Sequence, residues 1–448
     1  MIDRRGFLAA MAAGATARAQ SDPPPNILLV LFDKCRTDAW SCYDERPGAA
    51  TPHIDTLAKQ GTRFSNAFTP AALCGPARAS MLTGKYPHAH GLQRNVYSAP
   101  RGKVNTNYPE PIADPFRDGR FRLWDNFPFL LNNAGYATGC VGKWHLGPGN
   151  PGFFDTFKGF NSLLRHWVGE PHKSRYRPDI HTDEGIRFIE SNADRPWFLY
   201  QSYYAPHEPL DPPKEFAARF AGQENADYYA TVAHLDHCVG RLTDTLRRRN
   251  LLDNTLVIVT TDHGRTWIDR PGAAEGISLS YEEVARIPMV IRYPELFPAG
   301  KVWSSGVTTA DLMPTALEAA NVSAALGPPA FGLSPAIQAT SLAERLRGPD
   351  RWQSAVIMQN IPQRGIDGSY YEERAVRTAR HKLIVRKFEV RPELRDGELY
   401  DLETDRGESR NLYAAQPALV RDLAGQLAAW GRTNGDALAV ELGDWARR

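Results

Sequence analysis

The sequence predicts an α/β protein with a large, mostly parallel mixed sheet flanked by helices and a smaller C-terminal antiparallel α+β domain. Two observations carry this prediction. Up to about residue 340, short apolar runs alternate with helical patterns, which is typical of strands buried on both faces of a parallel sheet. Beyond that point, the pattern changes to a hairpin, a further strand and an amphipathic helix.

The strands of the large sheet are predicted from five apolar runs, which span residues 27–32, 137–141, 197–204, 255–261 and 288–293. Residues 182–191 and 228–248 read as helices, since the second segment carries apolar residues three and four positions apart. The sequence therefore predicts a doubly wound arrangement in which helices connect parallel strands.

The C-terminal region is predicted to form a hairpin from residues 375–378 and 382–386, a strand at 398–401 and a helix at 417–430. A segment rich in glycine, proline and alanine, residues 324–339, reads as the linker. We expect three parts: an N-terminal segment over residues 1–19 that is separate from the fold, a large α/β domain over 20–340 and a C-terminal subdomain over 341–448.

The composition is that of a globular protein, with 42% hydrophobic and 23% charged residues. Its 53 basic and 51 acidic residues create no broad field for nucleic acid, so any anion binding must be local. Five cysteines are too few for a disulfide scaffold, and no CxxC pair indicates zinc. Cys35 and Cys42 are candidates for a bridge after export, whereas Cys140 and Cys238 are expected to be buried thiols.

The N-terminus resembles a twin-arginine export signal. Arg4-Arg5 precede an apolar run over residues 6–17, and Ala17-Arg18-Ala19 fits a small-x-small cleavage site. The alternative, an uncleaved membrane anchor, is disfavoured because spanning a bilayer takes about 20 apolar residues. The sequence therefore predicts export by the twin-arginine machinery to the periplasm or the extracellular space.

Polar and reactive residues follow four of the predicted strands. They are Asp33 after the first strand, Gly142-Lys143-Trp144-His145 after the second, Pro206-His207-Glu208 after the third and Asp262-His263-Gly264 after the fourth. In open α/β sheets the ligand crevice lies beyond the carboxyl ends of the strands, so we expect these residues to meet in one site. For any single residue, the alternative is a turn-forming role.

Cys74 is predicted to open a helix, because Pro76 suits a first helical turn and Thr83-Gly84 ends the pattern. A helix N-terminus offers unpaired N–H groups and a positive potential, which lower a thiol pKa and attract anions. Arg78 lies one turn further along and adds a cation. The sequence thus predicts a reactive cysteine, with a buried structural thiol as the alternative.

The segment Cys74-x-Pro76-x-Arg78, followed by Ala-Ser-Met-Leu-Thr-Gly, closely resembles the signature of type I sulfatases. Further matching motifs lie at residues 25–33, 51–55, 142–147, 205–207, 261–264 and 398–402. The resemblance implies an alkaline phosphatase-like fold and calcium-dependent hydrolysis of sulfate monoesters. It also implies that a separate formylglycine-generating enzyme oxidises Cys74 to formylglycine before export.

The resemblance implies a role for each matching polar residue. Asp262 would help to deprotonate the attacking hydroxyl of hydrated formylglycine, and His145 would remove the second proton so that sulfate is released. His207 would protonate the leaving alcohol, while Lys143 and Arg78 would hold the sulfate and the formylglycine. The alternatives are structural histidines and ordinary surface cations.

The resemblance also implies a calcium site, whose ligands would be Asp33, Cys74 as formylglycine, Asp262 and His263. Carboxylate oxygens suit a hard cation. His263 is a softer ligand, although the family uses asparagine or histidine at this position.

Two positions depart from the family pattern. Lys34 stands where an oxygen ligand usually follows the first aspartate, and Ile277 stands where a sulfate-binding lysine is common. Together these changes make the site more positive by one charge. One hypothesis is that the Lys34 ammonium pairs with Asp33 and Asp262 and weakens or replaces calcium; the alternative is that Lys34 points away and calcium binds with fewer protein ligands. Either Arg265 or Arg270 is a candidate substitute for the missing lysine.

Three functions fit the sequence: a sulfatase, a phosphonate or phosphate ester hydrolase of the same superfamily, and a catalytically reduced protein that binds sulfated glycans. A G-x-S-x-G elbow, which would indicate a serine hydrolase, is absent from the sequence. Substrate choice is expected to depend on the loops over residues 95–122 and 153–179. Their arginine, histidine, tyrosine and tryptophan residues favour a sulfated sugar over small aryl or alkyl sulfates.

Overall fold

The computed structural model describes residues 23–43, 48–96, 114–117, 121–161, 164–169, 175–267, 279–323, 338–352, 354–360, 371–388 and 395–448. The predicted signal peptide, Arg270, Ile277 and most of the predicted linker lie outside these ranges. Two of the loops that we expect to select the substrate are only partly described.

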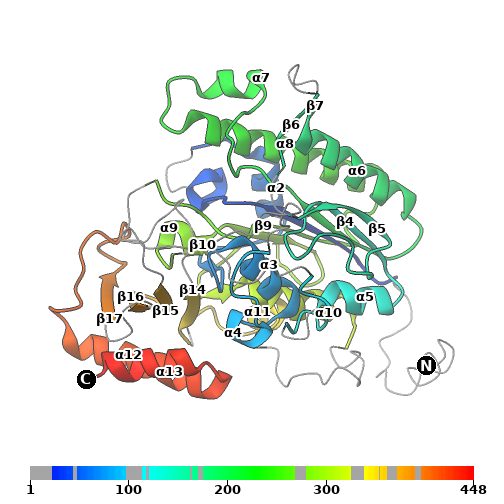
Figure 1. Ribbon diagram of the computed structural model, residues 1–448. Helices are drawn as coiled ribbons and strands as arrows, with labels where there is room; N and C mark the ends of the chain where they lie inside the picture. The colour runs from blue at the N-terminus through cyan, green and yellow to red at the C-terminus, as the bar shows by residue number, and fades with distance from the viewer. Residues whose placement is uncertain are drawn as a thin grey trace, which may run out of the picture.

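The large sheet contains eight strands within the described residues (Figure 1). Its spatial order is β12 (Lys301–Trp303), β2 (Thr62–Phe64), β11 (Met289–Arg292), β9 (Thr255–Thr261), β1 (Asn26–Phe32), β8 (Trp197–Ser202), β4 (Ala137–Lys143) and β5 (Thr156–Phe160). Strand β11 is antiparallel to β9 and β2, while the other pairs are parallel. The predicted mostly parallel mixed sheet is confirmed, and the five predicted strands match β1, β4, β8, β9 and β11.

Strand β1 shows why these runs are apolar throughout. Ile27, Leu29 and Leu31 belong to one core, and Leu28 and Val30 belong to the core on the opposite face. Since successive side chains alternate between the two faces, a strand covered on both sides must be apolar at every position.

Helices cover both faces of the large sheet (Figure 1). One layer contains α3 (Cys74–Thr83), α5 (Phe127–Asn133), α10 (Leu312–Ala320) and α11 (Leu342–Arg347), and the other contains α2 (Pro52–Gln60), α6 (Arg177–Ser191) and α8 (Ala226–Arg248). The predicted helices at 182–191 and 228–248 correspond to α6 and α8. α6 begins at Arg177, where the polar residues of its first turn lack apolar spacing, and α8 begins at Ala226, two residues earlier than predicted.

The C-terminal sheet is antiparallel and contains β14 (Val356–Asn360), β15 (Tyr371–Arg377), β16 (His381–Phe388) and β17 (Arg395–Asp401), in that order. Helices α12 (Pro417–Asn434) and α13 (Ala437–Ala446) cover one face, where Leu383 and Leu399 pack among their apolar side chains. On the other face, Ile384 packs with Phe68 and Val284 of the larger unit. The small sheet is therefore held between its own helices and the larger unit.

Buried charges join the small sheet to the larger unit. The Lys382 ammonium is fully buried, and it lies 2.8 Å from carboxylate oxygens of both Glu282 and Glu408 and 2.7 Å from the carbonyl oxygen of Ser280. The hydroxyl of Tyr281 donates to Glu398 at 2.7 Å. Two ion pairs and one hydrogen bond thus compensate the burial of this cation.

The remaining elements are short and were not predicted from the sequence. They are η2 (Thr37–Ala39), η3 (Ser41–Tyr43), β3 (Ala67–Phe68), α4 (Pro87–His90), β6 (Trp167–Val168), β7 (Arg175–Tyr176), α7 (Lys214–Ala217), η4 (Ala218–Phe220), α9 (Glu282–Ala285), β10 (Arg286–Ile287), β13 (Val307–Thr308) and η6 (Thr309–Asp311). Within the described ranges, we find no helix with the length and apolarity needed to cross a membrane. All five cysteines are free thiols, including the candidate pair Cys35 and Cys42.

Candidate active site

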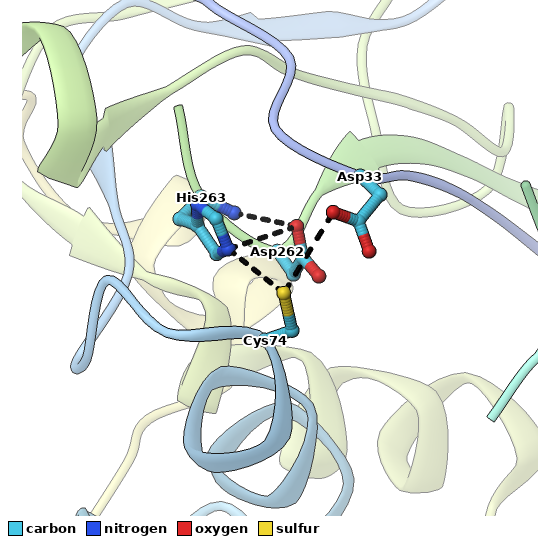
Figure 2. Close-up of side chains that lie close together, drawn as sticks. All are labelled: Asp33, Cys74, Asp262 and His263. Carbon is cyan, nitrogen blue, oxygen red and sulfur yellow. Dashed lines mark hydrogen bonds and ion pairs between the residues drawn. The ribbon is translucent and has the colours of Figure 1, made fainter. Parts of the chain in front are cut away.

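The structure brings the predicted strand ends together around Cys74. Asp33 follows β1, Lys143 ends β4, and Asp262 and His263 follow β9, while Cys74 is the first residue of α3. Figure 2 shows Asp33 and His263 directed at the Cys74 thiol, with Asp262 beside them and in contact with His263. All of these side chains are buried. The expectation that residues from separate strand ends meet in one site therefore holds for these residues.

The Cys74 thiol has three polar neighbours. Its Sγ atom lies 3.1 Å from Nε2 of His263, 3.5 Å from Nζ of Lys143 and 3.7 Å from Oδ1 of Asp33 (Figure 2 for the first and last). The backbone N–H of Gly75 in the first turn of α3 donates to the Asn95 side chain at 2.7 Å. A cation, a carboxylate and an imidazole thus converge on the first residue of a helix.

The sequence predicts a lowered pKa for the Cys74 thiol, and this prediction is wrong for the unmodified cysteine. Burial raises its pKa, and the Asp33 carboxylate raises it further, against the opposing effects of Lys143 and Arg78. A helix N-terminus does not offset the loss of hydration in a site that is 2% exposed. As a thiol, Cys74 is protonated and is a poor nucleophile at neutral pH.

Arg78 holds the two carboxylates of the site. Its Nε donates to Oδ2 of Asp262 at 3.0 Å, and Nη2 lies 3.0 Å from Oδ2 of Asp33 and 2.9 Å from Oδ2 of Asp262. The other arm, Nη1, donates to the carbonyl oxygen of Lys143 at 2.6 Å and to Ser202 Oγ at 2.8 Å. All five N–H donors of the guanidinium therefore have protein acceptors.

Lys143 pairs with Asp33 through a contact of 2.5 Å between Nζ and Oδ2. Burial disfavours the ammonium, but the nearby negative charges, of which the Asp33 carboxylate acts most strongly, together raise the pKa of Lys143. For Asp33, burial likewise opposes ionisation, yet Lys143, His207 and Arg78 lower the pKa well below its usual value. The Lys143 ammonium also lies 4.9 Å above the ring of Tyr204. Both groups are charged at neutral pH.

Gly142 lets β4 deliver Lys143 to the site. Its φ is +94°, and an added Cβ would lie 1.7 Å from the carbonyl oxygen of Ser202 on the adjacent strand β8. Only glycine allows this backbone conformation and this close approach together. His145, two residues beyond Lys143, also has a positive φ of 57°.

The predicted ligand set fits a hard divalent cation. Asp33, Cys74, Asp262 and His263 each offer one ligand atom, and these atoms lie within 4.8 Å of one another. The Nδ1 atom of His263 lies 2.8 Å from the carbonyl oxygen of Gly264, which can only accept, so Nδ1 carries the proton and Nε2 presents its lone pair to the cluster. Each carboxylate uses Oδ2 for Arg78, which leaves Oδ1 on the side of the cluster.

Lys34 does not occupy this ligand cluster, so the hypothesis that its ammonium pairs with Asp33 and Asp262 is wrong. Its Nζ lies 3.1 Å from Oε2 of Glu208. Only its backbone N–H reaches the cluster, donating to Oδ1 of Asp262 at 3.3 Å. The residue has a φ of +62°, which turns the side chain away from its neighbour Asp33. The alternative prediction, that Lys34 points away, describes the structure.

The two predicted proton-transfer histidines are buried near this charge cluster. Burial lowers the pKa of His145 well below its usual value, and Lys143 and Arg78 lower it further. Burial also lowers the pKa of His207 to about 3, although Asp33 opposes the shift. The His207 ring stacks on Tyr204 with centroids 4.6 Å apart. Both imidazoles are neutral in this state of the site.

Several residues of the site were missed by sequence reasoning. Ser202 and Tyr200, which contact Arg78, lie on β8 within a run that was interpreted only as a buried strand. Tyr204, which stacks on His207, lies in the same run and was missed as well. Their positions at or beside a strand end were the available signal, but tyrosine and serine there do not indicate a particular chemistry.

Arg265, one predicted substitute for the missing lysine, lies next to the site but is already paired. Its guanidinium forms an ion pair with Glu208 and stacks 3.7 Å from the ring centroid of Trp267. Glu208 thus neutralises part of the extra positive charge that Lys34 and Arg265 bring. Arg270, the other candidate, lies outside the described residues.

Comparisons with known proteins identify the family. The sulfatase family model matches residues 25–322, and the model of the N-sulphoglucosamine sulphohydrolase C-terminal region matches residues 277–430. The chain therefore belongs to the sulfatase family of the alkaline phosphatase-like superfamily, a class of sulfuric ester hydrolases. The predicted family and fold are confirmed.

The chain is 29% identical to the N-acetylgalactosamine-6-sulfatase of Canis lupus familiaris over 76% of its own length and 71% of that enzyme. It spans 65% of the Sus scrofa enzyme and 62% of the Homo sapiens enzyme of the same name. Among solved structures, a protein in complex with its substrate D-glucosamine-2-N,6-O-disulfate matches with a TM-score of 0.70 at 23% identity, covering 92% of this chain and 99% of that one. A phosphonate monoester hydrolase of Agrobacterium radiobacter matches with a TM-score of 0.68 at 20% identity, covering 92% and 96%.

Proposed function

We propose that this protein hydrolyses sulfate monoesters of carbohydrates, using a formylglycine made from Cys74 and a calcium ion held beside it. The observation that carries the proposal is the position of Cys74 at the first residue of α3, within 3.7 Å of Lys143, Asp33 and His263. The names of similar proteins, an N-acetylgalactosamine-6-sulfatase and a protein that binds a sulfated glucosamine, support a sugar sulfate as substrate.

The proposed calcium ligands are Asp33, Asp262, His263 and the oxygen at position 74. Calcium would supply positive charge that stabilises the sulfate oxygens and favours a deprotonated nucleophile. Arg78 contacts Oδ2 of both carboxylates, so Oδ1 of each faces the proposed calcium position. Arg78 and Lys143 keep Asp33 ionised, so the ligand set is ready at neutral pH.

Formylglycine, when hydrated, supplies a geminal pair of hydroxyls, one of which attacks sulfur. The surroundings of Cys74 suit that chemistry better than thiol chemistry, because burial and Asp33 keep the thiol protonated. Lys143, 3.5 Å from Sγ, is placed to hold the anionic ester beside position 74. Arg78 has all five donors on protein acceptors, so in this proposal it orients Asp33 and Asp262 and does not bind sulfate itself.

The two histidines would move protons. His207 is proposed to protonate the leaving alcohol, and His145 to take the proton whose loss releases sulfate. Both are neutral in the free site because burial lowers their pKa. His207 therefore has to gain its proton as the anionic substrate binds, since a nearby negative charge raises an imidazole pKa.

Export and maturation complete the proposal. Arg4-Arg5 and the apolar run after them support delivery to the periplasm or extracellular space by the twin-arginine machinery, which carries folded cargo. A formylglycine-generating enzyme would therefore act on Cys74 before export.

A comparison of three aryl esters tests the proposed function. The protein, co-produced with a formylglycine-generating enzyme, is given 4-nitrophenyl sulfate, phosphate and phenylphosphonate, with and without a calcium chelator. We expect the highest kcat/KM for the sulfate and loss of turnover with the chelator. A Cys74→Ala control should be inactive on all three esters. A preference for phosphate or phosphonate would instead identify a phosphoester or phosphonate hydrolase.

A further inference from the structure

Glu208 connects Lys34, one of the two departures from the family pattern, to His207. One carboxylate oxygen, Oε2, lies 3.1 Å from the Lys34 ammonium and 3.3 Å from Nδ1 of His207. The other oxygen, Oε1, forms the ion pair with Arg265. The side chain is 40% exposed, whereas the side chains of Lys34 and Arg265 are 2% and 11% exposed. Two buried cations thus hold the Glu208 carboxylate, and part of its side chain is exposed to solvent.

Hydrogen bonds of their backbone groups hold Lys34 and Arg265 in position, and Arg265 also has a side-chain contact. The carbonyl oxygen of Lys34 accepts from the Tyr228 hydroxyl at 3.0 Å, and its N–H donates to Asp262 at 3.3 Å. The N–H of Arg265 donates to the carbonyl oxygen of Glu283 at 3.1 Å, and its guanidinium stacks on Trp267. Neither cation needs to reorganise to hold Glu208, so the carboxylate has a defined place beside the imidazole.

Glu208 also fixes the tautomer of His207. Its backbone carbonyl oxygen lies 3.0 Å from Nδ1, and its carboxylate lies on the same nitrogen. Both oxygens only accept hydrogen bonds, so Nδ1 carries a proton in the neutral ring and in the cation. The exchangeable proton is therefore the one on Nε2.

The charges support an ionised carboxylate at this place. Burial opposes ionisation of Glu208, but Lys34 and Arg265 outweigh it and hold the pKa at about 2. The charged groups that act on His207 are Asp33, Lys143, Lys34 and Glu208. Both anions are paired with cations, Asp33 with Arg78 and Lys143 and Glu208 with Lys34 and Arg265. Glu208 is the one whose carboxylate lies at the ring nitrogen, 3.3 Å from Nδ1.

We propose that Glu208 is a positioning residue for His207, held in place by Lys34 and Arg265, and that it enables the enzyme to expel poorly acidic sugar alcohols. This inference rests on the proposed function, in which His207 protonates the leaving group. When the S–O bond breaks, its electron pair goes to the leaving oxygen, which takes the Nε2 proton of the imidazolium. The ring becomes neutral. Its Nδ1 proton stays on the ring, hydrogen-bonded to Glu208, and Nε2 takes up a new proton from solvent. The carboxylate stabilises the cation that exists before this transfer.

The leaving group provides the test, because an acidic phenol departs without a proton whereas an alcohol does not. Glu208→Gln and the wild type are compared on 4-nitrophenyl sulfate and on the sulfated monosaccharide that the wild type cleaves fastest. We expect kcat/KM of Glu208→Gln to fall by about 10²-fold for the sugar sulfate and by less than about 3-fold for the aryl sulfate. Glu215→Gln, the same change at an exposed position of α7, should match the wild type on both.

Lys34→Met gives an independent measurement, because Lys34 is proposed to act through Glu208. It should show the same selective loss for the sugar sulfate, and the double variant Lys34→Met/Glu208→Gln should be no slower than Glu208→Gln alone. Equal losses on both substrates, or no loss on the sugar sulfate, would overturn the role of Glu208. A double variant that multiplies the two single losses would overturn the role of Lys34. Failure of the wild type to cleave either sulfate would instead reject the proposed function, and this inference with it.

Discussion

Arg78→Lys is the substitution that most sharply probes how the site is built. The guanidinium offers five N–H donors, and all of them point to protein acceptors on Asp33, Asp262, Lys143 and Ser202. A lysine ammonium offers three donors from a single point, so at least two donations are lost even though the charge is retained. Each charge-assisted hydrogen bond contributes about 1.5–3 kcal/mol, and the expected loss in the free energy of unfolding is therefore about 3–6 kcal/mol.

The measurement is urea unfolding of Arg78→Lys and the wild type in the presence of chelator, so that metal cannot compensate for a misplaced carboxylate. Arg347→Lys is the control, since Arg347 is exposed and pairs with Glu318. Its expected cost is below about 1 kcal/mol. Turnover of Arg78→Lys should also fall by about 10²-fold because Asp33 and Asp262 lose their alignment. A stability within about 1 kcal/mol of the wild type would refute the argument that Arg78 holds the two carboxylates.

Two further substitutions test the support around the site. Lys382→Met should lower the free energy of unfolding by about 3–5 kcal/mol, because it leaves the buried carboxylates at the junction of the two sheets without their cation. Its control, Lys387→Met, removes a partly exposed ion pair and should cost below about 1 kcal/mol in the same urea titration. Gly142→Ala should abolish turnover and sharply reduce soluble yield, because its Cβ would collide with the Ser202 carbonyl. Its control, Gly135→Ala, has a similar φ and open space around it, so it should lower the free energy of unfolding by about 1–2 kcal/mol and keep turnover. Equal behaviour within either pair would contradict the contact assigned to Lys382 or Gly142.

The large sheet could be predicted because its central strands are apolar on both faces. The run at 255–261 coincides with β9, and the run at 27–32 falls one residue short of β1, which begins at Asn26. The short strands β2 and β12 were missed, since three residues with polar members carry too little periodicity to separate a strand from a loop. Their assignment depends on pairing with β11 and with each other, which is tertiary information.

The candidate site could be predicted in its residues but not in its contacts. The motif around Cys74 and the polar strand ends indicated Asp33, Lys143, Asp262 and His263, and the structure gathers them. The direction of the Lys34 side chain was not accessible, because it depends on a positive φ and on the distant partner Glu208. Ion pairs between residues 174 positions apart leave no local pattern in a sequence.

The chemical state of residue 74 tests the central claim most directly. Preparations co-produced with graded amounts of a formylglycine-generating enzyme are digested, and mass spectrometry of the peptide containing Cys74 gives the fraction converted to aldehyde. We predict that turnover of sulfate ester per total enzyme rises in proportion to that fraction and extrapolates to zero for the unconverted thiol. Full turnover by a preparation whose Cys74 is entirely thiol would contradict the account.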